Sequence, residues 1–152
     1  MSNSIAIFFD LGDTLVIPRF GVDGSVSALQ PLPFVTEVLD RVRSSGSAEA
    51  PHRLGVLSNT PADATTASMN GLLAEAGLLS RFEPDLLLYS SVEGHTKSEK
   101  AFFKLAASRA GVPAARCVFV GEDAKERDIA SSAGFRVSFH PLHLFHVLDQ
   151  IP

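Results

Sequence analysis

A carboxylate stands at the end of the first apolar run of the chain. Residues 5–9 read Ile-Ala-Ile-Phe-Phe, and Asp10 follows them directly. A buried strand that stops at an acid, followed by a turn containing Gly12 and the hydroxyl of Thr14, places that acid at the carboxyl edge of a sheet, where open α/β folds bind their ligands. An aspartate in this position is able to act as a nucleophile or as a metal ligand.

Two later apolar runs also end at polar residues. The run 54–57 ends at 58–60, which read Ser-Asn-Thr, and the run 118–120 ends at 121–123, which read Gly-Glu-Asp. A lysine, Lys97, lies between these two runs at the predicted start of a helix. The chain therefore offers four polar positions that a parallel sheet would bring to one edge.

With these positions in order, the chain resembles the haloacid dehalogenase superfamily of phosphohydrolases over almost its whole length. The family's signatures are an Asp-x-Asp-x-Thr strand end, a Ser or Thr at a second strand end, a Lys or Arg at a helix start, and an acidic Gly-Asp-type loop. Here they correspond to residues 10–14, Ser58, Lys97 and 121–128. The resemblance implies a Rossmann-like fold and a Mg²⁺-dependent phosphohydrolase that acts through an aspartyl phosphate on Asp10.

The phosphate-binding residues are expected at Ser58, Asn59 and Lys97. Ser58 and the backbone amides near Asn59 and Thr60 are able to donate hydrogen bonds to a phosphoryl oxygen and so stabilise developing charge; a simple turn and helix cap is the alternative. The resemblance implies that Lys97 bridges the nucleophile and the phosphate, and a solvated surface lysine is the alternative. Residues 96–99 suggest a capping box, which would put Lys97 in the first turn of a helix, where the dipole disfavours a cation by about 0.3–1 kcal/mol.

Mg²⁺ suits a site made of oxygen ligands. We expect an oxygen of Asp10, the backbone carbonyl of Gly12, one acid of the loop and waters to bind it. The family usually has an acid directly after the loop glycine and another five residues later. Here Glu122 is the acid after the glycine, whereas Asp123 and Asp128 have the five-residue spacing. Either Glu122 or Asp123 is predicted as the ligand, with Asp123 favoured because a shorter carboxylate fits octahedral geometry; a helix N-cap is its alternative role.

The first signature departs from the family pattern at Gly12. Family phosphatases have an aspartate there, which protonates the leaving group and then activates water, and the loss of such help typically costs 10²–10⁴ in rate. Three outcomes stay open. The protein hydrolyses substrates with good leaving groups, such as acyl or aryl phosphates; Asp13 or a substrate group replaces the missing acid; or the protein is a catalytically inactive phosphate- or protein-binding regulator.

The positioning elements are read from apolar runs that alternate with helical patterns. Continuously apolar runs at 86–88 and 118–120 indicate strands covered on both faces. We predict a three-layer α/β/α sandwich with a central parallel sheet, in one domain over 1–152, with no cap domain and a short flap or hairpin between 15 and 33. The predicted strands are 4–9, 53–57, 85–90, 117–120 and 136–139, and the predicted helices are 33–45, 62–77, 97–110 and 124–133.

Composition limits the partners and the compartment. The 152 residues are 45% hydrophobic and carry a net charge of −4, which disfavours a general nucleic-acid surface. A single cysteine, Cys117, excludes an intrachain disulfide and indicates a reducing compartment. Residues 1–4 do not begin a signal-like segment, and no apolar run is long enough to span a membrane. We expect a cytoplasmic protein whose partner is a small phosphorylated molecule or a phosphorylated macromolecule, with no membrane contact.

Three histidines, His140, His143 and His146, recur every third residue near the C-terminus. This spacing drifts around a helix, and no local cysteine or carboxylate joins them, so a metal site is disfavoured and a terminal amphipathic segment over 142–148 is expected. His95 lies close to Lys97 in sequence and is expected to line the mouth of the site.

Overall fold

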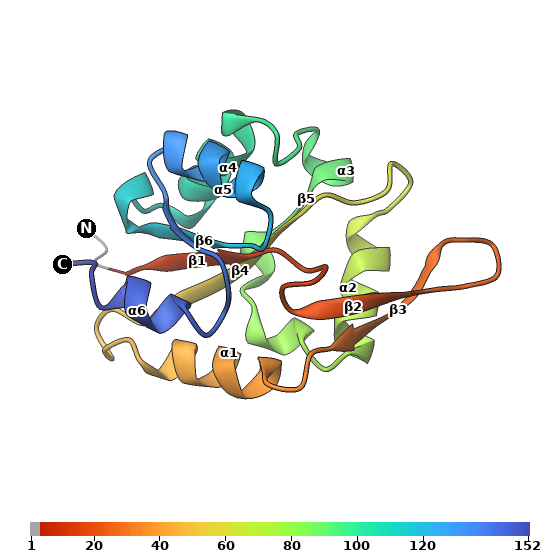
Figure 1. Cartoon of the computed structure of the whole chain (residues 1–152), viewed down its shortest axis with the longest axis horizontal. Helices are drawn as coiled ribbons and strands as arrows, with labels where there is room; N and C mark the ends of the chain where they lie inside the picture. Colours follow the sequence, from red (N-terminus) through yellow and green to blue (C-terminus); the bar gives the residue numbers. More distant parts are fainter. Residues whose placement is uncertain (1–3) are drawn as a thin grey trace.

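The computed structural model describes residues 4–152. Its central sheet has five parallel strands in the order β5-β4-β1-β6-β7 (Figure 1). Because all strands run in one direction, their carboxyl ends meet at one edge, as the sequence predicts. The strands are β1 (Ala6–Phe9), β4 (Arg53–Ser58), β5 (Leu87–Tyr89), β6 (Cys117–Val120) and β7 (Arg136–Ser138).

Helices cover both faces of the sheet, so the molecule is the predicted three-layer sandwich. Figure 1 shows α1 and α6 on one side of the sheet and α4 and α5 on the other. None of the helices in the described part of the chain is both long and apolar enough to cross a membrane. The helices are α1 (Val35–Ser44), α2 (Thr66–Glu75), α3 (Ser90–Glu93), α4 (Lys100–Ala110), α5 (Ala124–Ser132) and α6 (Leu144–Leu148), with short 3₁₀ turns at Leu79–Arg81, Pro84–Leu86 and Ala114–Arg116.

Two buried clusters hold the layers together, one on each face of the sheet. Strand β1 serves both, because successive side chains of a strand point to opposite faces. Ile7 and Phe9 pack in the cluster with α1, α2 and α6, whereas Ala6 and Phe8 pack in the cluster with α4 and α5. Cys117 is buried in the second cluster, and its burial raises the pKa of its thiol to about 12. The central strand is thus fixed from both sides, which holds the residue that follows it.

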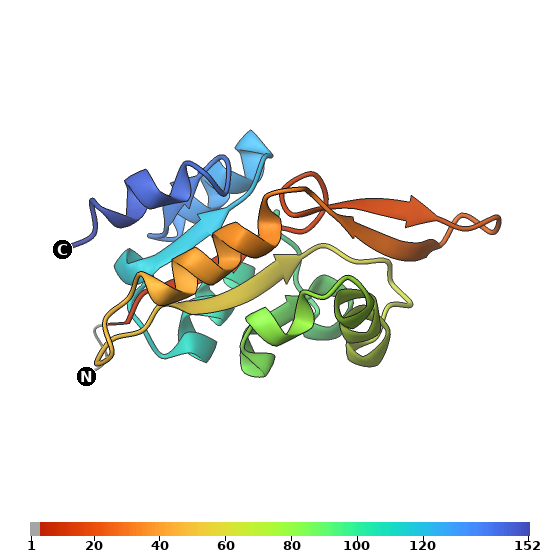
Figure 2. The same ribbon diagram turned by 90° about the horizontal axis from the view of Figure 1, so that it is seen from below.

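The flap predicted between 15 and 33 is an antiparallel hairpin of β2 (Val16–Phe20) and β3 (Val26–Pro31). It projects beyond the sheet at the end away from both chain termini (Figure 2). Its outer residues are solvated: Phe20 is 66% exposed, and Val22 at the tip is fully exposed. Only the base of the hairpin therefore contributes to the core, through residues such as Val16 and Leu29.

Several element boundaries differ from the prediction. Helix α2 begins at Thr66 instead of 62, because Thr65 forms the N-terminal capping box with Ser68. The predicted strand 85–90 begins as a 3₁₀ turn and is a strand only over Leu87–Tyr89. Helix α4 begins at Lys100, three residues after Lys97. The last difference changes the surroundings of a predicted site residue.

Candidate active site at the carboxyl edge of the sheet

Asp10 lies directly beyond β1 and is 8% exposed. Its backbone amide donates to the carbonyl of Val120 on the neighbouring strand at 2.9 Å, so the ladder between β1 and β6 continues through it. The amide of Leu11 donates to Asp10 Oδ1 at 2.9 Å, and the Thr14 hydroxyl lies 3.5 Å from Oδ2. The carboxylate is thus oriented by its own turn, with Oδ2 the less strongly bound oxygen.

Lys97 contacts Asp10 although 87 residues separate them. Its side chain is 3% exposed, and its Nζ lies 2.5 Å from Asp10 Oδ1 and 3.0 Å from Glu126 Oε1. The same Nζ lies 5.8 Å from the centre of the Phe119 ring, within the range of a cation–π contact. A lysine that is buried this deeply needs anionic partners, and here it has two. The solvated-lysine alternative does not describe this residue.

The turn that carries Lys97 precedes α4, so the prediction that Lys97 lies in the first helical turn is wrong. Thr96 and Glu99 form part of a capping arrangement, in which the Thr96 amide donates to Glu99 Oε1 at 3.1 Å, but this closes the turn and does not begin the helix. The cost that the helix dipole imposes on a cation in the first helical turn therefore does not apply to Lys97. The backbone amide of Lys97 donates to Asn59 Oδ1 at 2.9 Å, which ties this turn to the end of β4.

Glu126, in the first turn of α5, was not selected from the sequence, yet it faces Lys97. Burial is the main cause that raises the pKa of the Glu126 carboxyl; the Lys97 ammonium opposes this rise, and the charges of Asp10 and Asp123 add to it. Asp10 and Asp123 therefore both lie within electrostatic range of Glu126. Glu126 could have been selected from its position three residues after Asp123, because residues three apart are neighbours on one face of a helix.

The loop after β6 approaches Asp10 closely. Asp123 caps α5 by accepting a hydrogen bond from the Glu126 amide at 3.0 Å, the alternative role considered for it, and Glu122 is exposed. A Cβ atom on Gly121 would lie 2.7 Å from the Phe119 ring and 3.5 Å from the Cβ of Asp10. Glycine is therefore required where this loop passes the candidate nucleophile.

Ser58 ends β4 beside Asp10 and is buried, but the predicted amide clamp is only partly free. The Thr60 amide donates a hydrogen bond to Ser90 Oγ at 2.8 Å and is therefore already bound within the protein. The prediction that this amide donates to a phosphoryl oxygen is wrong. The Ser58 hydroxyl makes one long contact, 3.4 Å, to the carbonyl of Asn59. Ser58 thus keeps a hydroxyl available at the edge, whereas the Asn59 side chain supports the Lys97 turn.

Solved structures with this arrangement of strands and helices are similar over nearly their whole length. A HAD-superfamily hydrolase from Ehrlichia chaffeensis superposes with a TM-score of 0.69 at 12% identity, covering 100% of both chains. A HAD phosphatase from Thermococcus onnurineus gives 0.71 at 16% identity, covering 97% of this chain and 98% of that one. A 2-haloacid dehalogenase from Pseudomonas syringae gives 0.72 at 17% identity, covering 97% and 99%. The chain has the haloacid dehalogenase fold.

No protein-family model matches the sequence, and no curated protein is significantly similar to it. At these identities the structural likeness establishes the haloacid dehalogenase fold alone. What the chain does must therefore be argued from its own side chains.

On this haloacid dehalogenase fold, Gly12 lies two residues after Asp10, the candidate nucleophile, at the position where the resemblance implies a second aspartate in family phosphatases. The carbonyl of Leu11 accepts hydrogen bonds from the amides of Thr14, Leu15 and Val16, which closes a tight turn. Asp13 adopts φ 62° in this turn and is exposed. A cavity opens next to Asp10; Gly12 is among the residues that line it, whereas Asp13 is not. This placement disfavours Asp13 as the replacement acid.

The residues around Asp10 fit a divalent cation of the Mg²⁺ type. Nearby carboxylates outnumber the buried cation, since both Asp10 and Asp123 act electrostatically on Glu126 and Lys97 supplies one positive charge. The turn's backbone hydrogen bonds are accepted by Leu11 and Val16, so the Gly12 carbonyl takes no part in them. No group of three His, Cys, Asp or Glu side chains is gathered as a metal site within residues 4–152. A bound Mg²⁺ would therefore need backbone carbonyl and water oxygens in addition to the carboxylates.

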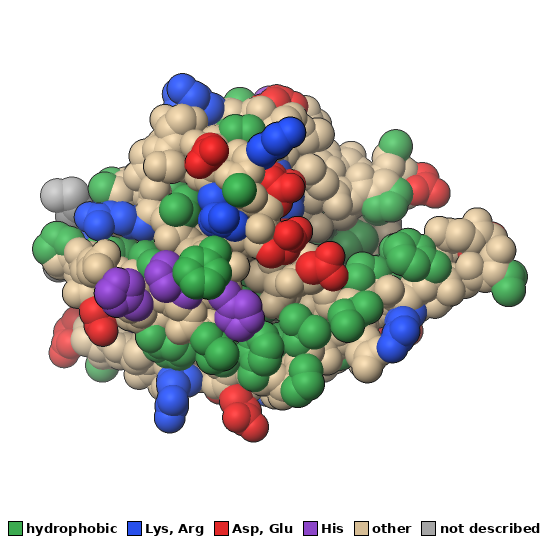
Figure 3. Space-filling view, in the orientation of Figure 1, with side chains coloured by type: hydrophobic (Ala, Val, Ile, Leu, Met, Phe, Trp, Pro, Cys, Tyr) green, Lys and Arg blue, Asp and Glu red, His purple; other side chains and the backbone are tan. Residues whose placement is uncertain are grey.

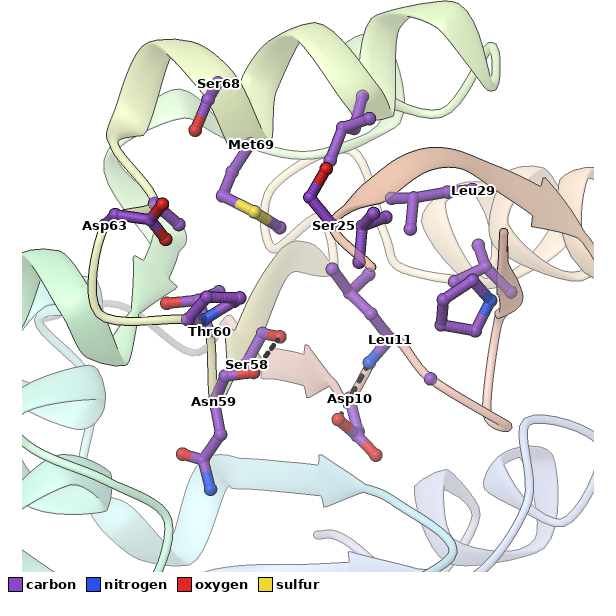
Figure 4. Close-up of a pocket in the computed structure, with 17 residues that line it drawn as sticks. Asp10, Leu11, Ser25, Leu29, Ser58, Asn59, Thr60, Asp63, Ser68 and Met69 are labelled. Carbon is purple, nitrogen blue, oxygen red and sulfur yellow. Dashed lines mark hydrogen bonds between the residues drawn. The ribbon is translucent and has the colours of Figure 1, made fainter. Parts of the chain in front are cut away.

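A cavity of about 490 Å³ opens beside Asp10, between the hairpin and α2; we name it the hairpin cavity. Figure 4 shows Asp10 and Ser58 at its base, with Leu29 and Ser25 of the hairpin region and Met69 of α2 around it. Its apolar lining comes from elements distant in sequence: Leu11, Val16, Val26, Leu29, Met69 and Leu72. The cavity was not predicted, because no local pattern shows which faces of the hairpin and α2 meet.

The C-terminal histidines lie elsewhere and interact with aromatic rings. His143 stacks on Phe139 with ring centres 4.4 Å apart, and His140 lies 5.1 Å from the Phe34 ring. Figure 3 shows the histidines around an exposed aromatic ring on the surface near α6. These contacts agree with the amphipathic segment expected there, now seen as α6. His95 pairs with Glu99 at 2.9 Å and is not part of the hairpin cavity lining.

Proposed function

We propose that this chain is a Mg²⁺-dependent phosphohydrolase in which Asp10 attacks the phosphorus of a phosphorylated substrate. The observation that supports it is the buried pair of Asp10 and Lys97 at the carboxyl edge of the sheet, 2.5 Å apart. A carboxylate held by a buried cation at the base of a cavity is suited to nucleophilic attack on an anionic ester. The fold, shared with hydrolases, supports the same class of reaction.

Each side chain has its own role in the proposed reaction. Asp10 Oδ1 is bound by Lys97 and by the Leu11 amide, which leaves Oδ2 as the attacking oxygen. Lys97 holds the nucleophile in place and attracts the phosphate, and Ser58 offers a hydroxyl to a phosphoryl oxygen. Mg²⁺, bound by Asp10, the Gly12 carbonyl and Glu122 or Asp123, would supply the charge neutralisation that lets two anions react.

The test is Mg²⁺-dependent release of phosphate from acetyl phosphate, which needs little protonation of its leaving group. Asp10→Asn should lower the rate at least about 1,000-fold, because the nucleophile is lost. The matched control is Asp13→Asn in the same turn, since asparagine tolerates the left-handed conformation of Asp13 and this side chain lies outside the cavity.

A second candidate function is phosphate binding without turnover, favoured by the absence of an acid at Gly12. Binding of inorganic phosphate with Mg²⁺, but no hydrolysis that depends on Asp10, would establish it. Retention of hydrolysis by Asp10→Asn would reject Asp10 as the nucleophile.

A further inference from the structure

The hairpin cavity is large enough to accept an organic group attached to the phosphate. Its volume of about 490 Å³ lies within the usual range for small-molecule sites. It adjoins Asp10 and Ser58, so a phosphoryl group bound there would direct its ester substituent between the hairpin and α2 (Figure 4). The shape of this space therefore selects the leaving group.

The charges of the lining exclude one large class of substrates. Among its 17 lining residues the only charged side chains are Asp10 and Asp63, both acidic, and no Lys, Arg or His is present. A second phosphate or a carboxylate on the substrate would find no cation there and would meet like charge. An uncharged apolar group would instead contact the side chains of Val26, Leu29 and Met69.

The turn beside Asp10 limits the leaving group further. Gly12 has no side chain that could protonate a departing oxygen, and Asp13 lies outside the cavity. Simple alcohols are poor leaving groups without such an acid, whereas phenols, whose pKa is near 10, depart more readily as anions. Both the cavity lining and the absence of an acid at Gly12 thus favour an uncharged phenol as the leaving group.

We propose that the hairpin cavity holds the uncharged aromatic leaving group of an aryl phosphate monoester. The inference rests on the proposed function and deepens it. Oδ2 of Asp10 forms a bond to phosphorus while the bond from phosphorus to the aryl oxygen breaks. The aryloxide leaves with the electron pair and takes a proton from water. A second water then attacks the aspartyl phosphate, which releases inorganic phosphate and restores the Asp10 carboxylate.

Binding of unreactive phosphonates tests the cavity apart from turnover. By calorimetry in the presence of Mg²⁺, benzylphosphonate should bind about 10- to 100-fold more tightly than methylphosphonate, because only the former buries a ring. A carboxylate on the ring, in 4-carboxybenzylphosphonate, should lower the affinity at least about 10-fold. Equal affinity of benzyl- and methylphosphonate would overturn the inference.

A charge placed in the wall should reverse this preference. Val26→Lys puts a cation in the partly buried wall, so 4-carboxybenzylphosphonate should then bind more tightly than benzylphosphonate. Val22→Lys, on the fully exposed tip of the same hairpin, is the matched control and should leave the wild-type order unchanged. If the lysine variant does not fold, as judged by its circular dichroism melt, Val26→Thr keeps the shape of valine and should lose ring preference several-fold. An unchanged preference in a folded Val26 variant would overturn the inference.

Hydrolysis assays distinguish its failure from that of the proposed function. 1-Naphthyl phosphate should be hydrolysed at least about 10-fold faster, as kcat/KM, than the alkyl ester 2-phenylethyl phosphate. If acetyl phosphate is hydrolysed but the two ring substrates are equal, the inference fails and the function stands. If acetyl phosphate is not hydrolysed, both fail. A phosphotyrosyl peptide identifies the source of the ring: faster turnover than 1-naphthyl phosphate assigns it to a protein side chain, slower turnover to a small molecule, and both support the aryl chemistry.

Discussion

The edge of the sheet and the hairpin cavity meet at Asp10 but are built in opposite ways. At the edge, Lys97 is 3% exposed and held by two carboxylates within 3.0 Å, on elements that the core fixes from both faces. The cavity is walled largely by apolar side chains, and its hairpin extends into solvent (Figure 2). Under the proposed function, the reactive groups depend on the sheet, whereas substrate choice depends on a hairpin that can vary without disturbing the sheet.

Lys97→Met removes the buried cation at the edge of the sheet and should have the largest effect on stability and activity. Without its ammonium, Asp10 and Glu126 face each other as partly buried like charges, so the free energy of unfolding should fall by about 3 kcal/mol. Hydrolysis of acetyl phosphate should fall at least about 1,000-fold. Urea denaturation and a phosphate-release assay measure the two effects.

The matched control is Lys104→Met on the exposed face of α4, which should change stability by less than about 0.5 kcal/mol. Equal effects of the two substitutions would show that Lys97 contributes no more than an exposed lysine.

Gly12→Asp acts where the two regions join. A Cβ on Gly12 would find its nearest neighbour, Pro18 Cγ, at 3.9 Å, so a Cβ atom fits there without a clash. Restoring an acid there should raise hydrolysis of an alkyl phosphate about 10- to 100-fold, part of the 10²–10⁴ that general acid–base help supplies. Aryl phosphates should gain less, and steady-state rates on both esters measure the difference. Unchanged or lower rates would show that position 12 is not the missing acid/base position.

Glu126→Gln should lower kcat about 10-fold. Lys97 would still pair with Asp10 in this variant, but it would lose the charge of its second carboxylate partner. The variant also changes the pH dependence of stability. Burial raises the pKa of Glu126 above its ordinary 4.5, so the folded state binds this proton more tightly than the unfolded state. This contribution stabilises the fold at low pH and is lost as pH rises through the raised pKa.

Glutamine does not ionise, so Glu126→Gln does not undergo this decrease in stability as pH rises. The free energy of unfolding of the variant relative to wild type should therefore rise between pH 4 and pH 7. Urea denaturation across this range in EDTA measures it. A relative stability that falls with pH would contradict the assigned direction.

The layered fold was predictable because its signals are local. Continuous apolar runs at 86–88 and 118–120 indicated strands covered on both faces, and parallel strands necessarily bring residues such as Asp10 and Ser58 to one edge. Glu126, the start of α4 and the hairpin cavity were missed. Each depends on which side chains meet across elements far apart in the chain, which propensity and periodicity do not encode. The metal ligand choice between Glu122 and Asp123 stays a prediction.

The hydrogen bond from the Lys97 amide to the Asn59 side chain joins the turn before α4 to the end of β4. The amide hydrogen of Lys97 exchanges with solvent when this hydrogen bond opens, so its exchange rate reports the free energy of opening at the candidate site. Isotope exchange in the unliganded protein therefore measures the free energy of opening of the candidate site before any substrate is known.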